Sequence, residues 1–232
     1  MSAFSDAFTF VADNGHLLLT KTETHLVISG EAVLISVLVG VPLGVVLGHI
    51  HKGSFLAINA SNLGRALPSL AVLSILLPVV GITRANVIIT LVILGFPPIL
   101  TNTYVAIEQV DADAVEAAKG MGMRPHQVIL GVEMKLALPL IFAGVRTAAV
   151  FVVATATLAG VFGGGGLGDI LFNRPEYKLS GLIGASYILV VLALAAQVLF
   201  KALELIVTPT GLRKRPRADT AQTIDPRVLQ PA

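Results

Sequence analysis

Five long stretches of this sequence carry very few charged side chains, and they constrain the fold more than any other feature. They lie near residues 25–49, 64–82, 86–108, 138–162 and 180–207. An α-helix rises 1.5 Å per residue, so about 20 apolar residues cross the ~30 Å hydrocarbon core of a bilayer. None of the stretches alternates as a barrel strand does, and backbone groups in lipid need internal partners. We therefore predict an all-α integral membrane protein with about five transmembrane helices.

The composition agrees with this class and excludes others. Only 13% of the 232 residues are charged, about half of the roughly 25% found in soluble domains. The chain has no cysteine, which excludes disulfides and thiolate metal sites. The net charge of +2 could suggest nucleic acid, but the basic residues gather at span ends and in the tail, as membrane orientation requires. We expect the lipid bilayer as a partner and no nucleic acid.

Basic residues between the spans predict the orientation. One side receives Lys52, Arg65, Lys119, Arg124, Lys135 and the tail cluster Arg213, Lys214, Arg215 and Arg217, whereas the other receives Lys21, Arg84, Arg174 and Lys178. Because cytoplasmic loops carry the excess of Lys and Arg, we expect residues 1–20 outside the cell and residues 109–137 in the cytoplasm. The membrane domain then covers residues 21–212, and the polar residues 213–232 are expected to form a disordered cytoplasmic tail. The N-terminus lacks the basic region of a cleaved signal peptide, so no removal is expected.

Residues 109–137 interrupt the apolar chain with a polar, helix-prone segment. Asp111 suits a helix N-cap, and Gly120 and Gly122 suit a helix end. Pro125 then fits the first turn of a second helix, which would run to about Lys135. The residues predict two short helices joined by a glycine elbow. They leave open whether this is a solvated loop or a surface that a partner contacts.

A glycine-rich stretch follows the fourth predicted span. It contains Gly163, Gly164, Gly165, Gly166, Gly168 and Asp169, and it matches the G-x-G-x-x-G pattern formally. A dinucleotide site would need a preceding strand, whereas this stretch follows a membrane helix on the outer side. We predict a sharp turn or re-entrant loop, because glycine permits positive φ and close backbone approach.

Isolated polar groups lie within or beside the spans. Asn102, Thr103, Tyr104 and Thr155 are candidates for a polar pathway, with interhelical hydrogen bonding as the alternative. Glu31 is a candidate functional carboxylate, although structural pairing is the favoured interpretation. Gly40, Gly44 and Gly48 form a small-residue ladder that predicts close helix packing within the chain or, less favoured, a homodimer seam. The spacing of the histidines predicts no metal site, and no catalytic residues are expected.

The polar segment resembles the "EAA" coupling loop of binding-protein-dependent ABC importer permeases. Glu116, Ala117, Ala118 and Gly122 match that motif, and the resemblance extends over roughly residues 20 to 210. It implies a type I ABC importer permease fold in the inner (cytoplasmic) membrane, with the ATPase-coupling residues Glu116, Ala117, Ala118, Gly120, Gly122 and Pro125. The implied partners are a cytoplasmic ABC ATPase that binds ATP and Mg, an extracytoplasmic binding protein and a second permease copy or paralogue. The chain itself would bind no cofactor.

The surrounding sequence is most similar to the subfamily that imports osmoprotectants such as glycine betaine, choline and carnitine. That subfamily commonly has Leu-Pro at the positions of Met134 and Lys135, so the end of the coupling loop is expected to differ here. The chain has no Trp and three Tyr, which places quaternary-amine recognition mainly in the binding protein. An amino-acid permease and an ATPase-independent secondary transporter are the alternatives.

Overall fold

The computed structural model describes residues 2–51, 55, 59, 62 and 66–208. The described part is a bundle of helices. Its α-helices are α1 (Ser2–Asp13), α2 (Gly15–His49), α4 (Ser69–Val80), α5 (Arg84–Glu108), α6 (Ala112–Gly120), α7 (Pro125–Val128), α8 (Met134–Thr155), α9 (Leu167–Phe172) and α10 (Arg174–Val207). A π-helical turn, η1 (Ile129–Glu133), precedes α8, and a 3₁₀ turn, η2 (Ala156–Gly160), follows it. The predicted tail at 213–232 lies outside the described residues, as do Lys52 and Arg65.

Four of the five predicted spans are helices long enough to cross a bilayer. They are Gly15–His49, Arg84–Glu108, Pro125–Gly160 and Arg174–Val207. The first begins at Gly15 rather than at residue 25, because the polar residues before the apolar run are helical too. Within residues 1–20, α1 forms a helix that packs on α10, where the rings of Phe10 and Tyr177 meet edge to face at 6.4 Å.

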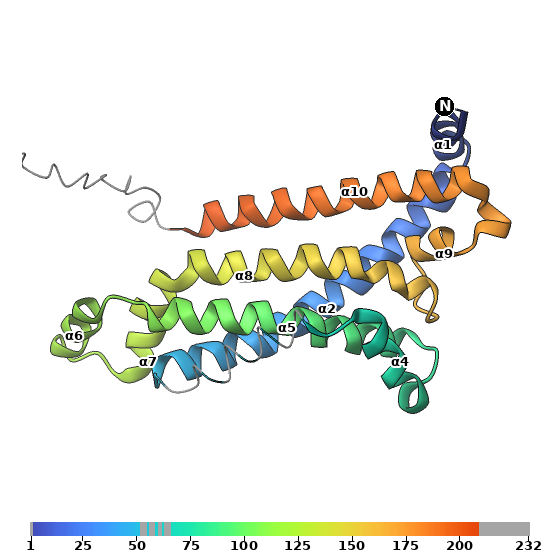
Figure 1. The fold of residues 1–232 in the computed structure, drawn as a ribbon. Coiled ribbons are helices and arrows are strands. Elements are labelled where there is room, and N and C mark those ends of the chain that lie inside the picture. The colour runs from blue at the N-terminus through green and yellow to red at the C-terminus, as the bar shows by residue number, and fades with distance from the viewer. Residues whose placement is uncertain (1, 52–54, 56–58, 60–61, 63–65, 209–232) are drawn as a thin grey trace, which may run out of the picture.

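The second predicted span, 64–82, is described as the 12-residue helix α4. At 1.5 Å per residue α4 is about 18 Å long, too short to cross alone. Pro68 precedes its first turn and Gly81, at a φ of 78°, ends it, so two residue types that terminate helices shorten an otherwise apolar run. α2 and α5 run in the same direction, and α4 lies beside the beginning of α5 (Figure 1).

The glycine ladder of α2 packs against α5, as predicted for packing within the chain. A Cβ on Gly40 would meet Ile99, one on Gly44 would meet Thr103, and one on Gly48 would meet Ile107. Each step of four residues along α2 therefore corresponds to a step of four residues along α5 in the same direction. The two helices are parallel. Close backbone approach of this kind is what small residues allow where lipid gives no hydrophobic drive.

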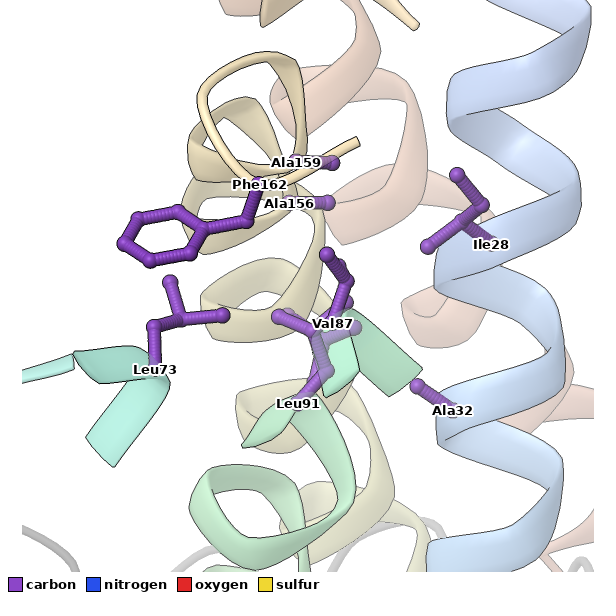
Figure 2. Packing of buried hydrophobic residues seen from close by; sticks show 9 residues of the cluster. Ile28, Ala32, Leu73, Val87, Leu91, Ala156, Ala159 and Phe162 are labelled. Atoms are coloured by element: carbon purple, nitrogen blue, oxygen red, sulfur yellow. The ribbon is translucent and has the colours of Figure 1, made fainter. Parts of the chain in front are cut away.

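The best-buried part of the core lies toward the end of the bundle where α5 begins. Figure 2 shows Ile28 of α2, Leu73 of α4 and Leu91 of α5 pointing toward Ala156 and Phe162 after α8. By contrast, α10 leaves many large apolar side chains exposed, among them Val190, Val191, Leu194 and Val198. This is the distribution expected where lipid replaces water around the protein.

Candidate functional site: the polar segment and the outer glycine-rich turn

The polar segment and the glycine-rich turn lie at opposite ends of the bundle. α6 and α7 project beyond the end where α5 stops and α8 starts, whereas α1 and α9 lie at the other end (Figure 1). Residues 109–137, termed the coupling segment below, therefore connect two long helices without being enclosed by the bundle.

Local backbone chemistry builds the coupling segment as the sequence predicts. The carboxylate of Asp111 accepts a hydrogen bond from the backbone N–H of Asp113 at 2.9 Å and caps α6. α6 ends at Gly120, and Gly122 adopts a φ of 80°, a conformation that glycine adopts without steric cost. Pro125 occupies the first turn of α7. The predicted first short helix, the glycine elbow and the helix start at Pro125 are confirmed.

Most of the predicted coupling residues lie on the surface. The exposed ones are Glu116, Ala117, Gly120, Gly122 and Pro125. Ala118 is only 1% exposed and forms the buried side of α6. The sequence reasoning missed Met121, which is 76% exposed at the elbow, and Leu130, which is 63% exposed on η1. Their signal was present in the sequence as large apolar residues within a polar segment. The outer face of the segment thus combines small residues with apolar side chains that nothing in the described chain covers.

The end of the coupling segment differs from the prediction. No separate second helix stops near Lys135; α7, η1 and α8 instead form one continuous helical stretch from Pro125 to Gly160. Lys135 retains the backbone N–H that a proline would lack, which is compatible with this uninterrupted stretch. Within η1, the N–H of Met134 bonds to the carbonyl of Ile129, and Glu133 is buried beside His49 at the end of α2.

The outer glycine-rich turn is densely packed. Gly163, Gly165 and Gly166 have φ values of 76°, 78° and 86°. A Cβ on Gly168 would overlap the carbonyl oxygen of Thr157, so α9 lies directly against η2. The turn follows a 3₁₀ helix and precedes a six-residue helix, which is not the strand–loop–helix context of a dinucleotide site. The predicted sharp turn is confirmed, and Asp169 after it pairs with Lys21 of α2 at 2.5 Å.

Two of the four predicted pathway residues, Asn102 and Thr103, pack closely against neighbouring helices. The amide of Asn102 donates to the Pro98 carbonyl at 2.7 Å, and its Cβ lies where Gly144 of α8 leaves room. Thr103 is buried against Gly44, and the Tyr104 hydroxyl donates to Glu108 at 2.6 Å. Thr155 is half-buried at the end of α8. The hydrogen bond of Asn102 lies within α5, and the buried hydroxyl of Thr103 has no hydrogen-bond partner among the described residues. Interhelical hydrogen bonding is therefore not seen for these two residues, and a pathway role for the four stays a prediction.

The charged residues within the spans are paired. Glu31 accepts from Arg84 at 2.6 Å in an exposed pair, and Arg146 of α8 donates to Glu204 of α10 at 3.0 Å. The structural interpretation of Glu31 is therefore the one that the geometry supports. Among the residues that the structure describes, no group of three His, Cys, Asp or Glu side chains is placed to hold a metal.

A bundle with four helices long and apolar enough to cross a bilayer is the architecture of a multi-pass membrane protein. The family model of binding-protein-dependent transport system inner membrane components matches residues 40–209. The chain belongs to this family, and it is an inner-membrane ABC transporter permease.

Relatives and solved structures agree with that assignment. The choline transport system permease protein OpuBB of Bacillus subtilis (strain 168) is 40% identical over 210 residues, which cover 88% of this chain and 95% of that protein. The glycine betaine/carnitine/choline permease OpuCB of the same organism is also 40% identical, with the same coverage. The carnitine transport permease OpuCB of Listeria monocytogenes is 38% identical over 89% of this chain and 95% of its own length. The fold is similar to that of a chain in the inward-facing MetNI methionine ABC transporter, with a TM-score of 0.72, 22% identity, and coverage of 83% of this chain and 97% of that one.

Proposed function

We propose that the chain is the transmembrane permease subunit of an ATP-driven importer for quaternary-amine osmoprotectants. It would move the substrate from an extracytoplasmic binding protein to the cytoplasm. The observation that carries this proposal is the coupling segment. It is held to the bundle through buried Ala118, while the rest of its small-residue surface and Met121 remain exposed.

The surface of the coupling segment is suited to bind a separate protein. Gly120 and Gly122 have no heavy atom within 4 Å of the position that a Cβ would take. No intramolecular packing therefore requires small residues there, whereas a protein docking closely over the elbow would. We assign this partner as a cytoplasmic ABC ATPase that binds ATP and Mg and carries out hydrolysis. A second permease copy or paralogue would complete the pathway.

The charge distribution supports an orientation with the coupling segment inside the cell. The segment carries Lys119, Arg124 and Lys135, and the sequence adds the basic cluster at 213–217 on the same side. Since cytoplasmic loops are enriched in Lys and Arg, α1 and the glycine-rich turn would face the binding protein. The glycine elbow and the exposed residues beside it would then face the ATPase.

The substrate class rests on the relatives, whose names specify choline, glycine betaine and carnitine. The three tyrosine rings of this chain already make contacts within it. Tyr104 is buried, Tyr177 packs on Phe10, and the ring centroids of Tyr187 and Phe8 lie 5.5 Å apart. Quaternary amines are held by free aromatic faces. We therefore assign their recognition mainly to the binding protein rather than to this subunit.

Reconstitution in proteoliposomes with the partner ATPase and binding protein tests the proposal. We expect ATP-dependent uptake of labelled glycine betaine, choline or carnitine, and no uptake without the ATPase. Uptake of a labelled amino acid in place of these amines would establish the amino-acid alternative. Uptake that persists without ATP or the ATPase would establish a secondary transporter and refute the proposal.

A further inference from the structure

One buried ionic contact joins the coupling segment to a different membrane helix. Nδ1 of His49, the last residue of α2, lies 2.8 and 2.9 Å from the two carboxylate oxygens of Glu133. The carboxylate can only accept when ionised, so Nδ1 donates. The Glu133 side chain is 5% exposed and that of His49 is 26% exposed. A charge buried to this degree is normally retained only with a partner.

The π-helical turn explains why Glu133 faces α2. Val128 is only 1% exposed and Glu133 only 4% exposed, although they lie five positions apart in the sequence. In a regular α-helix five residues correspond to a rotation of about 140° between the two side chains. The extra residue of η1 removes this offset and turns both toward the bundle. π-Helical turns of this kind are rare and often occur at functional sites.

The helix that Glu133 contacts is itself fixed to α5. The ladder of Gly40, Gly44 and Gly48 leaves no room for a methyl group between α2 and α5, so these helices must move as one body. The coupling segment reaches α8 through continuous helix. It reaches the cytoplasmic end of α2 through the contact of Glu133 with His49, which are 84 residues apart in sequence. Beside this contact, Ile129 and Met134 pack against an apolar cluster that includes Val45 of α2, so the hydrogen bond adds a directed link to apolar packing.

We infer that Glu133 and His49 are positioning residues that make the α2–α5 pair follow the coupling segment when the ATPase moves it. This inference rests on the proposed function for its driving partner. Without the contact, displacement of α6 and α7 would reach α2 only through apolar packing, which fixes direction less strictly than a hydrogen bond, so α2 would follow less closely. We assign the two side chains a role in transmission, because what they join is the coupling segment and the end of α2.

The transport experiment compares Glu133→Gln and His49→Gln with the wild-type chain in the reconstituted complex. We expect uptake per ATP hydrolysed to fall by about tenfold, within the range typical of coupling between sites, while ATP hydrolysis itself persists. His49→Lys should restore uptake, because lysine again places a hydrogen-bond donor beside the Glu133 carboxylate. The matched control is Glu31→Gln, which breaks the exposed pair with Arg84 near the middle of the same helix and should leave the ratio unchanged. A proportional fall of uptake and hydrolysis would reduce the contact to a structural role and overturn the inference, as would wild-type ratios in both variants.

A distance measurement decides the inference even if the proposed function fails. The chain contains no cysteine, so Ile50→Cys and His126→Cys can carry spin labels at the end of α2 and on α7. In nanodiscs we expect one narrow distance distribution, which Glu133→Gln broadens and Glu31→Gln does not. An unchanged distribution in Glu133→Gln would refute the linkage. Absence of ATP-driven uptake in the wild-type complex would refute only the proposed function.

Discussion

The outer glycine-rich turn and the glycine elbow of the coupling segment both use glycine at positive φ, but their surroundings differ. At the outer turn a Cβ on Gly163 would meet Ile82 at 3.0 Å, and one on Gly166 would meet His25 at 3.3 Å. At the elbow nothing lies within 4 Å of Gly120 or Gly122. The outer glycines are required by packing within the chain. The elbow requires positive φ at Gly122 alone, and its remaining small residues need an explanation outside the described chain.

The same contrast separates stability from function. Changes at the outer turn should act on folding, because backbone already occupies the space that a side chain would need. Changes at the elbow should leave folding nearly intact and act on transport. The two ends therefore predict different phenotypes for the same kind of substitution.

The largest effect should come from Gly168→Ala. The added methyl group would overlap the carbonyl of Thr157, and relieving this would separate α9 from η2 at a cost of about 3 kcal/mol or more. We expect little folded protein in the membrane. Gly120→Ala is the matched control and should be as stable as wild type, because alanine suits a helix better than glycine. The yield and thermal stability of detergent-extracted protein measure both, and equal stability of the two variants would remove the contrast.

Loss of transport without loss of folding is expected for Gly122→Asp. Asp tolerates the left-handed conformation better than most residues, so the φ of 80° should cost only about 1 kcal/mol. The added carboxylate would stand at the exposed elbow, and docking of the ATPase weakened by about 1.4 kcal/mol or more would lower uptake at least tenfold. Uptake by proteoliposomes containing equal amounts of inserted protein measures this. Normal uptake would contradict the role assigned to the elbow.

Features of the fold that depend on local sequence are predicted well, whereas those that depend on how distant helices pack are not. Long apolar runs identify four crossing helices because hydropathy is a local property, and Asp111 and Pro125 mark helix starts by their own chemistry. The short length of α4 was predictable only by weighing Pro68 and Gly81 above the apolar run. The π-helical turn has no comparable local signature. The contact of Glu133 with His49 depends on how α2 and α8 pack, so no sequence spacing indicates it.

Neighbouring alanines of α6 sharpen the contrast within a single helix. Ala118 is 1% exposed, so Ala118→Leu should overpack its site and cost about 1–3 kcal/mol. Ala117 is exposed, so Ala117→Leu should change the free energy of unfolding by less than about 0.5 kcal/mol. Its effect should instead be lower uptake per inserted chain. Thermal unfolding and uptake measured on both variants test this, and equal destabilisation would show that α6 packs differently.

A smaller effect is expected for Met121→Ser. Its side chain is 76% exposed, so removing its apolar surface costs the isolated chain almost nothing. An apolar side chain buried by the ATPase would contribute about 1 kcal/mol of binding free energy. We expect affinity for the ATPase to fall about fivefold, as measured by binding to the permease in nanodiscs. Unchanged affinity would place Met121 outside the interface.

The smallest effect should come from the outer ion pair. Lys21 and Asp169 lie 2.5 Å apart, with side chains 26% and 29% exposed. Lys21→Met leaves a carboxylate that water still reaches, so we expect a loss of at most about 1 kcal/mol. His49→Leu would instead leave the 5% exposed carboxylate of Glu133 without its partner, at a cost nearer to about 3 kcal/mol. Thermal unfolding of the two variants compares pairs of similar length that differ in burial. If Lys21→Met were the more destabilising change, burial would not be the property that separates the two ends of α2.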